Sequence, residues 1–290
     1  MSISPNDIDQ HTLHTFDVEL NKLNGMLLGI TELLAIQLEL SLQALEKSNS
    51  LYAADSISLI NDIRTIKSEF DFKVPVIIAK FWPVANDLRF VVSILKIADQ
   101  LGKVSDEIAC FAHFVDGSFS SPSKTLASPL LSHSIEIGRY VLSLLNALRA
   151  TIDSDETDTS FNILESDRNL EKSLYNKLEY QLIQIVQDKM YDEVDKILPL
   201  ISLLDVCPSE FRRIFACIIS YRLADCRFRR KWIADAAYYL AEHRNFSPGF
   251  ELDDWLMAEK EFQTNMISRY ESVPFERNGI TAKELTALYE

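Results

Sequence analysis

The stretch that decides the fold reads Phe81-Trp-Pro-Val-Ala-Asn-Asp-Leu-Arg-Phe-Val-Val-Ser-Ile-Leu-Lys-Ile-Ala-Asp-Gln-Leu-Gly-Lys-Val-Ser-Asp106. Proline has no backbone N–H and breaks a helix, so Pro83 predicts a turn. The residues after this turn are apolar at helical spacing, and Asp87 is a suitable N-cap for them. The stretch therefore predicts an amphipathic helix from about Asp87 to Val115 that closes a helical hairpin.

The composition also favours helices. The chain has 290 residues, of which 47% are hydrophobic, and it contains only 7 glycines and 9 prolines. So few glycines and prolines argue against a turn-rich all-β fold. Abundant leucine, isoleucine, alanine, glutamate and lysine favour long helices. We therefore expect an all-α protein.

Apolar residues at helical spacing continue on both sides of the opening stretch. A Ser- and Pro-rich linker over residues 117–129 divides them into two sets of three helices. The predicted helices cover residues 15–48, 52–81, 87–115, 131–152, 161–191 and 209–242. We expect a kink at Pro75 and an unusually long turn over residues 192–207. The pattern predicts two tandem antiparallel three-helix units, residues 11–116 and 130–231, in one helical bundle.

A helical hairpin is predicted after the bundle, over residues 232–265. Its first helix looks continuous with the last bundle helix, and residues 245–249 form its turn. A hairpin of this size is too small for a core of its own, so Tyr238, Trp255 and Phe262 are expected to pack within it or on the bundle, or else to form a docking surface. Residues 266–290 are expected to be an irregular tail with a short helix from Ala282 to Tyr289.

The charge and the cysteines restrict the location and the partners. The net charge of −14 argues against nucleic acid and anionic lipid as partners. The four cysteines form no C-x-x-C pair, which is typical of free thiols in a reducing cytosol. The first residues contain neither a basic n-region nor an apolar h-region, so we expect no signal peptide. The most apolar helix, over residues 26–45, contains Glu32, Gln37 and Glu39 and is predicted to be too polar to span a bilayer. We expect a cytoplasmic protein.

The opening stretch resembles the signature of the PhoU family of phosphate-signalling adaptors, over about residues 11–230 in all. The family pattern runs Pro-Val-Ala-x-Asp-Leu-Arg, then an apolar run with Lys-Ile-Ala, then Glu-x-x-x-Asp. The matching residues here are Pro83, Val84, Ala85, Asp87, Leu88, Arg89, Lys96, Ile97, Ala98 and Asp106. The resemblance implies a bundle of two three-helix units. It also implies an adaptor between a phosphate ABC transporter ATPase and a sensor histidine kinase, acting negatively when phosphate is plentiful.

The resemblance further implies iron or zinc clusters on paired acids, one pair in each half of the chain. Here the first pair is Gly102 and Asp106, and the second is Asp225 and Arg229, so each has lost an acid. A lone carboxylate holds a transition metal weakly. The acids and the histidine nearest Asp106 are Asp99, Glu107 and His113, which could regroup around it. We expect no cofactor, with Asp106 and Asp225 as degenerate metal ligands at most. Asp225 is instead expected to pair with Arg229 at i+4.

The C-terminal hairpin resembles a short bacterial family of unknown function. The residues that carry this resemblance are Ile233, Ala237, Tyr238, Gly249, Asp254, Trp255, Leu256, Ala258 and Glu259. The chain's only dense basic cluster precedes the hairpin. The candidates for partner contact are Arg89, Arg227, Arg230 and Trp255. For Arg89 the favoured role is structural, in a pair with an acid on a neighbouring helix, and partner contact is the alternative.

No enzyme signature is present: the chain lacks a P-loop, a dinucleotide fingerprint, H-E-x-x-H and G-x-S-x-G. The first hypothesis is therefore a non-enzymatic, homodimeric regulator of phosphate uptake and phosphate-starvation signalling. The alternatives are a divergent helical interaction module with a changed partner, and a metal-binding helical bundle.

Overall fold

The computed structural model describes residues 5–83, 85–119, 128–153, 158–165, 169–190 and 194–272. Every regular element in these ranges is helical, and the predicted all-α class is confirmed. The helices are α1 (Pro5–Lys47), α2 (Ser50–Phe81), α3 (Ala85–Ser118), α4 (Ser128–Asp153), α5 (Asp158–Glu165), α6 (Asn169–Gln187), α7 (Val194–Ala224), α8 (Cys226–His243), α9 (Glu251–Phe262) and α10 (Ser268–Ser272), with a π-helical turn over Gln263–Ile267 before α10. Val84, most of the linker and the helix expected over residues 282–289 lie outside the described residues.

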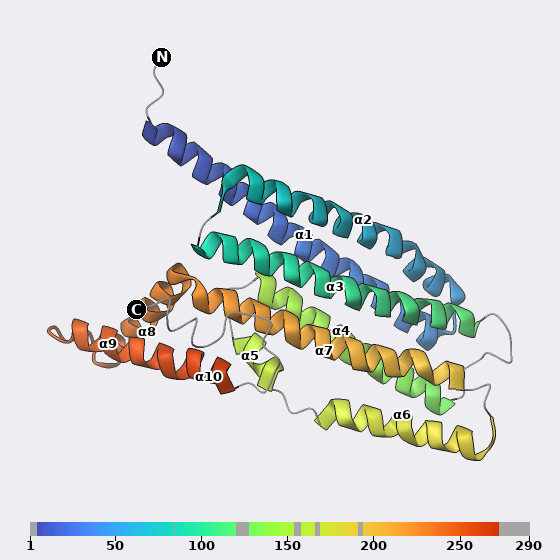
Figure 1. The fold of residues 1–290 in the computed structure, drawn as a ribbon. Coiled ribbons are helices and arrows are strands. Elements are labelled where there is room, and N and C mark those ends of the chain that lie inside the picture. Colours follow the sequence, from blue (N-terminus) through green and yellow to red (C-terminus); the bar gives the residue numbers. More distant parts are fainter. Residues whose placement is uncertain are drawn as a thin grey trace.

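The bundle consists of two layers of antiparallel helices (Figure 1). One layer contains α1, α2 and α3, and the other contains α4, α6 and α7. Helix α3 packs along α7 and α1 packs against α4, so these two contacts join the layers. The core that lies between them is made of leucine, isoleucine, valine and phenylalanine side chains.

Local sequence features fix the ends of α2. The Asn49 side chain accepts a hydrogen bond from the backbone N–H of Leu51 and so caps the first turn. At the other end Trp82 takes a left-handed conformation, with φ of 50°, and its N–H bonds back to the carbonyl of Ile78. Pro83 follows and α3 begins at Ala85, as the opening stretch predicts.

Helix α1 contacts both other helices of the first layer. Within Thr15–Lys47 a window of 18 residues has a mean hydropathy of 1.5, so by length and composition alone this helix could cross a membrane, contrary to the expectation from Glu32, Gln37 and Glu39. In the structure α1 contacts α2, α3 and α4, and 44% of that window is buried. A polar contact also joins it to α2, because the hydroxyls of Ser41 and Ser56 lie 2.9 Å apart in the buried interface.

The bundle differs from the prediction in three places. Helix α7 begins at Val194 and continues through Pro199 and Pro208, where a long turn was expected. Buried neighbours on both sides of Pro208 keep this segment helical, because packing outweighs the lost hydrogen bonds. The helix expected over residues 161–191 is two helices, α5 and α6. Asp87 lies in the first turn of α3 and is not its N-cap.

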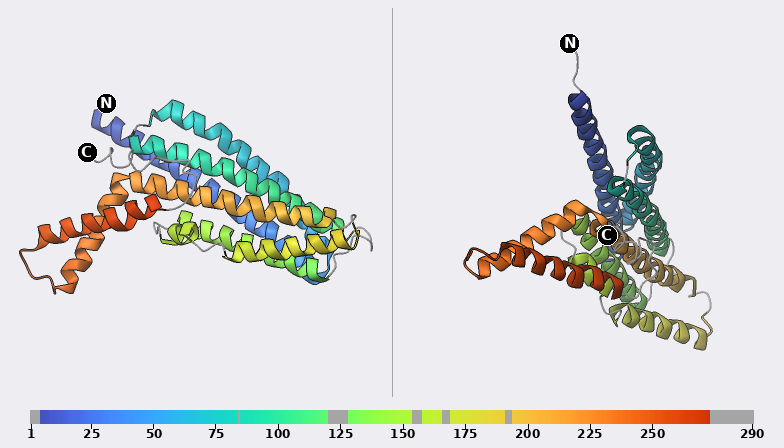
Figure 2. Two further views of the ribbon diagram at one scale, coloured as in Figure 1. Left: turned by 60° about the horizontal axis from the view of Figure 1, so that its bottom comes forward. Right: turned by 60° about the vertical axis from the view of Figure 1, so that its left-hand side comes forward.

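The C-terminal hairpin also starts differently from the prediction. The last bundle helix ends at Ala224, and Asp225 is the N-cap of α8, accepting a hydrogen bond from the backbone N–H of Arg227. Helices α8 and α9 form the hairpin, which projects from the bundle (Figure 2). The expected irregular tail is helical as far as Ser272, and Met266, Ile267 and Tyr270 in it are buried.

Candidate functional site

The first acidic motif lies on α3 and faces a lysine. A Cβ atom at position 102 would overlap the side-chain end of Lys67, which comes from α2, so an ammonium group occupies the space directly over Gly102. Asp106, one turn further along α3, is exposed. A cation at this place repels a metal ion, and one carboxylate is a poor site by itself.

The neighbours of Asp106 do not gather around it. Asp99 is exposed and lies 3.8 Å from the ammonium of Lys103, one turn along the same helix. Glu107 accepts a hydrogen bond of 2.7 Å from the hydroxyl of Ser202, so it faces α7. His113 is exposed near the far end of α3. The regrouping that the sequence left open is therefore not seen.

The second acidic motif is divided between two contacts. The Asp225 carboxylate caps α8 and lies 3.4 Å from Nε of Arg227. The guanidinium of Arg229 turns away and bonds to Glu259 on α9 at 2.6 Å. The side-chain contacts described for Asp225 and Arg229 go to Arg227 and Glu259 in place of the expected pairing, and a backbone hydrogen bond of 3.0 Å joins the two residues.

The donor groups at these two motifs do not fit an iron or zinc cluster. Across the described ranges, no group of three or more His, Cys, Asp or Glu side chains is placed to hold a metal ion. Both motif positions that lost an acid now have a cation beside them or in their place. We expect purified protein to contain well below about one equivalent of iron or zinc. Elemental analysis measures this, and stoichiometric metal that Asp106→Ala removes would contradict it.

Gly102 also allows a test of the Lys67 contact by stability. In Gly102→Ala only the mobile end of Lys67 must move, so the helix propensity of alanine should stabilise the protein by about 0.5–1 kcal/mol. Gly138 on α4 is the matched control, because a Cβ there would lie 2.5 Å from Cδ2 of the buried Leu42. Overpacking should make Gly138→Ala destabilising by about 1–3 kcal/mol. Urea denaturation measures both, and an equal effect of the two substitutions would exclude this explanation.

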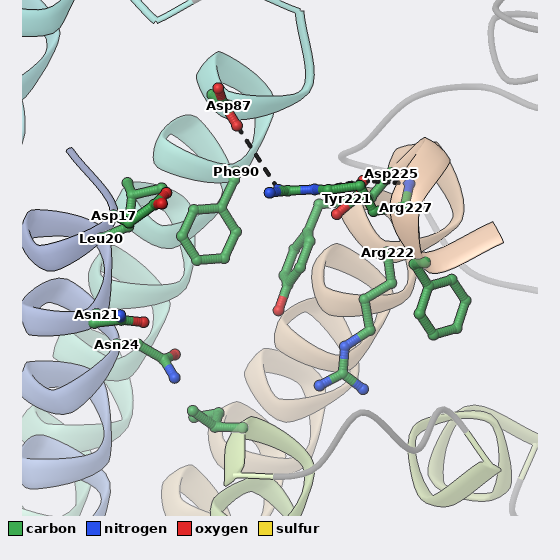
Figure 3. Close-up of a pocket in the computed structure, with 12 residues that line it drawn as sticks. Asp17, Leu20, Asn21, Asn24, Asp87, Phe90, Tyr221, Arg222, Asp225 and Arg227 are labelled. Carbon is green, nitrogen blue, oxygen red and sulfur yellow. Dashed lines mark hydrogen bonds and ion pairs between the residues drawn. The ribbon is translucent and has the colours of Figure 1, made fainter. Parts of the chain in front are cut away.

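A polar cleft of about 460 Å³ lies at the end of the bundle where α8 begins. Figure 3 shows side chains from α1, α3 and the α7–α8 junction around it. The residues that line it are Asp17, Leu20, Asn21, Asn24, Asp87, Phe90, Ile152, Tyr221, Arg222, Asp225, Arg227 and Phe228. This lining contains carboxylates, amides and guanidinium groups but no Ser, His or Cys, so it is suited to bind charged groups.

Arg227 is the residue that crosses this cleft. Its guanidinium extends from α8 and lies 3.8 Å from the carboxylate of Asp87 on α3 (Figure 3). The negative charge of Asp225, followed by those of Asp87 and Asp17, raises the pKa of Arg227 above its usual value. Its side chain is 72% exposed, so this ion pair is weak. The pair nevertheless links the hairpin to the first unit.

The other partner-binding candidates lie in different settings. Arg230 is exposed on α8, one residue after Arg229, and Trp255 is 37% exposed on α9. Arg89 is half-buried in the first turns of α3. Of the expected hairpin core only Phe262 is buried, where its ring packs edge-on against Trp232 at 5.4 Å. Tyr238 is 56% exposed and contacts Phe246 within the hairpin, so for this residue the docking-surface alternative stays open.

Sequence reasoning missed the aromatic pair at the cleft and the buried arginine beside it. The rings of Phe90 and Tyr221 meet at 5.3 Å and join α3 to α7. Arg222 is buried and donates a hydrogen bond of 2.7 Å to the carbonyl of Thr151 at the end of α4. The sequence did contain a sign of Arg222, because an arginine on an otherwise apolar helix face is expected to have a hydrogen-bond partner inside the protein.

Comparison with known proteins supports both resemblances. A model of the PhoU domain matches residues 27–115, and a model of a protein family of unknown function, DUF2934, matches residues 229–264. The phosphate-specific transport system accessory protein PhoU of Serratia marcescens is 22% identical over 182 residues, which are 63% of this chain and 73% of that protein.

Two solved structures share the fold. The phosphate transport system regulatory protein PhoU from Streptococcus pneumoniae aligns with a TM-score of 0.61 and 21% identity, over 72% of this chain and 98% of that one. PhoU from Pseudomonas aeruginosa aligns with a TM-score of 0.60 and 21% identity, over 71% and 98%. The chain therefore matches the PhoU domain over residues 27–115 and DUF2934 over residues 229–264, and its bundle has the fold of the PhoU structures.

Proposed function

We propose that this chain is a non-enzymatic, cytoplasmic regulator of phosphate uptake that acts as an adaptor between a phosphate transporter ATPase and a sensor histidine kinase. It restrains phosphate-starvation genes when phosphate is plentiful. The observation that carries the proposal is the PhoU match over residues 27–115, which contains the Pro83–Arg89 turn and the whole of α3 as far as Val115. The matched relatives are named as accessory proteins of phosphate-specific transport.

The adaptor acts through helix surfaces in this proposal. Arg227 and Arg230 lie on the exposed side of α8, next to the polar cleft. Trp255 is 37% exposed on α9, and large partly exposed aromatic residues are frequent anchors of protein interfaces. A surface of this composition is suited to reversible docking, since exposed charges determine partner choice and the rate of association.

A homodimer is part of the same proposal. Helix α6 exposes an apolar stripe at helical spacing, made of Tyr180, Ile183 and Val186, each at least 44% exposed, and the exposed Met190 follows just beyond its end. A second copy can bury such a stripe in a two-fold contact. Sedimentation equilibrium of the full chain measures this, with Ile183→Glu expected to give monomers.

The test of the regulatory role is alkaline phosphatase activity in a strain that lacks the gene, grown in abundant phosphate. We expect high activity, because starvation genes lose their restraint, and low activity again when the wild-type gene is restored. When the gene that is restored encodes the Arg230→Glu variant, the phosphatase activity should stay high. Arg64→Glu is the matched control, because Arg64 is an exposed arginine on α2, away from the cleft. Low activity in the deletion strain, with no second gene of the family present, would overturn the proposal.

A second candidate function follows from the Lys67 contact. The ammonium of Lys67 lies over Gly102, and Arg229 stands at the second motif position and bonds to Glu259, so a cation lies where the family pattern has an acid in both motifs. The loss of the acids favours the alternative in which the chain keeps the bundle fold but binds a different partner protein. A pull-down that retains transporter or kinase components would exclude this alternative.

A further inference from the structure

The hairpin is held firmly at its base. The guanidinium of Arg229 bonds to Glu259 at 2.6 Å and lies over the ring of Phe262. Beyond α9, Arg269 donates a hydrogen bond of 3.2 Å to Asn162 and lies 4.6 Å from the centre of the Phe161 ring, both on α5. The module is therefore fixed to the second unit by two chain segments, while its far end projects from the bundle (Figure 2).

The far end of the hairpin, residues 238–257, exposes large apolar side chains; we call this region the tip. The exposed fractions range from 48% to 70%, and the residues are Tyr238, Tyr239, Phe246, Phe250, Leu252 and Leu256. The Tyr238 ring lies 5.4 Å from that of Phe246 and 5.9 Å from that of Tyr239. So many large apolar side chains on one small projecting element mark an interaction site.

The backbone turn of the tip holds these side chains in position without a partner. Asn245 and Phe246 have φ of 53° and 55°, the left-handed region, which is rare for a bulky aromatic residue. Arg244 is bonded to the carboxylate of Asp254 and lies 4.8 Å from the centre of the Phe250 ring, so the turn is braced from within. A strained turn that holds an aromatic ring outward is expected where the ring has a role in binding.

The charge of the tip indicates which kind of partner it fits. Residues 238–257 contain four acids and one arginine, a net charge of −3. Arg244 is paired with Asp254, so the charge comes from Glu242, Glu251 and Asp253, all of which are exposed. Two tips would repel each other, and an anionic membrane would repel one. A segment that combines apolar residues with lysine or arginine is complementary to this surface.

We propose that the tip is a docking surface for a basic amphipathic helix of another protein. The apolar face of that helix covers Phe246, Leu252 and Leu256, and its lysines and arginines meet Glu242, Glu251 and Asp253. This module provides an interaction separate from the PhoU bundle, and it stands whether or not the chain regulates phosphate uptake.

The test uses the full chain and labelled model peptides of about 18 residues, long enough to form a helix. One peptide is an amphipathic helix of leucine and lysine, and its counterpart has glutamate in place of lysine. We expect the lysine peptide to bind, with weaker binding at high salt because the charges are screened. The glutamate peptide should not bind. Fluorescence anisotropy of the label measures the dissociation constant.

Matched variants locate the binding. Leu252→Ser with Leu256→Ser removes apolar area from the tip and should weaken binding by roughly tenfold or more. Leu51→Ser with Phe72→Ser removes two apolar side chains of α2 that are at least as exposed, and it should leave binding unchanged. Asp253→Lys should weaken binding more than Asp62→Lys, an exposed aspartate on α2.

Four results would overturn the proposal. They are no binding of the lysine peptide, equal effects of the tip and α2 variants, equal binding of the two peptides, and stronger binding to phosphatidylglycerol vesicles than to the lysine peptide. Circular dichroism of each variant shows that its helices are intact, so lost binding is not lost folding. None of these readouts depends on phosphate-regulated genes, so the failure of this proposal and of the regulatory one are distinguishable.

Discussion

Phe70→Ala is expected to destabilise the protein by about 3–5 kcal/mol, because it removes a large buried side chain and leaves a cavity. Phe70 lies on α2 with no exposed surface, and it belongs to the core that α2 shares with the rest of the bundle. Natural domains are stable by only about 5–15 kcal/mol. The loss is therefore a large fraction of the total stability, and the urea midpoint followed by circular dichroism should fall markedly.

The same helix supplies the control for this substitution. Phe72 is two residues away and 73% exposed, because the helical turn directs it to solvent. Phe72→Ala removes the same atoms but should change the free energy of unfolding by no more than about 0.5 kcal/mol. Comparable losses from the two substitutions would mean that α2 is turned differently about its axis.

Glu171→Ala is expected to lower the free energy of unfolding by about 3–5 kcal/mol, because it leaves the buried charge of Arg212 without its partner. Glu171 on α6 and Arg212 on α7 form two parallel bonds of 2.8 and 3.2 Å, and their side chains are only 13% and 11% exposed. This pair holds α6 against the bundle. The measurement is the free energy of unfolding from urea denaturation.

A double-mutant cycle distinguishes the pair from simple packing. Glu171→Leu with Arg212→Met replaces both charges by apolar groups of similar size, and it should recover most of the lost stability. The exposed pair Lys73–Glu69 on α2, at 3.2 Å, is the surface control, and Glu69→Ala should cost less than about 1 kcal/mol. If the double variant were as unstable as Glu171→Ala, the buried charge of Arg212 would not be the cause.

The helical class and the first unit could be predicted because local signals and packing agree there. Pro83, the helical spacing after it and the scarcity of glycine all indicate a hairpin of long helices, and α2 and α3 match it closely. In the second unit, local and tertiary signals disagree. Pro208 is typical of a helix start, yet α7 passes through it because the residues around it are buried against other helices.

The candidate site was less predictable, since its chemistry depends on partners distant in sequence. Spacing alone placed Asp225 and Arg229 on one helix face. The helix break at Asp225 and the presence of Glu259 on α9 are tertiary facts that separate them. Likewise, Gly102 shows that an acid is missing, but only the fold shows that Lys67 occupies its place. The residues that line the polar cleft come from five helices, so no local sequence pattern predicts it.

The two attachments of the hairpin have a consequence for how the chain comes apart. The hairpin leaves the bundle at Asp225 and is bound to it again through Arg269, where Met266, Ile267 and Tyr270 are buried. A segment joined at a single end can melt by itself, whereas one held at both ends shares its unfolding with whatever holds it. The hairpin base and α5 are therefore one cooperative unit, and amide hydrogen exchange should protect Phe262 and Phe161 to a similar degree.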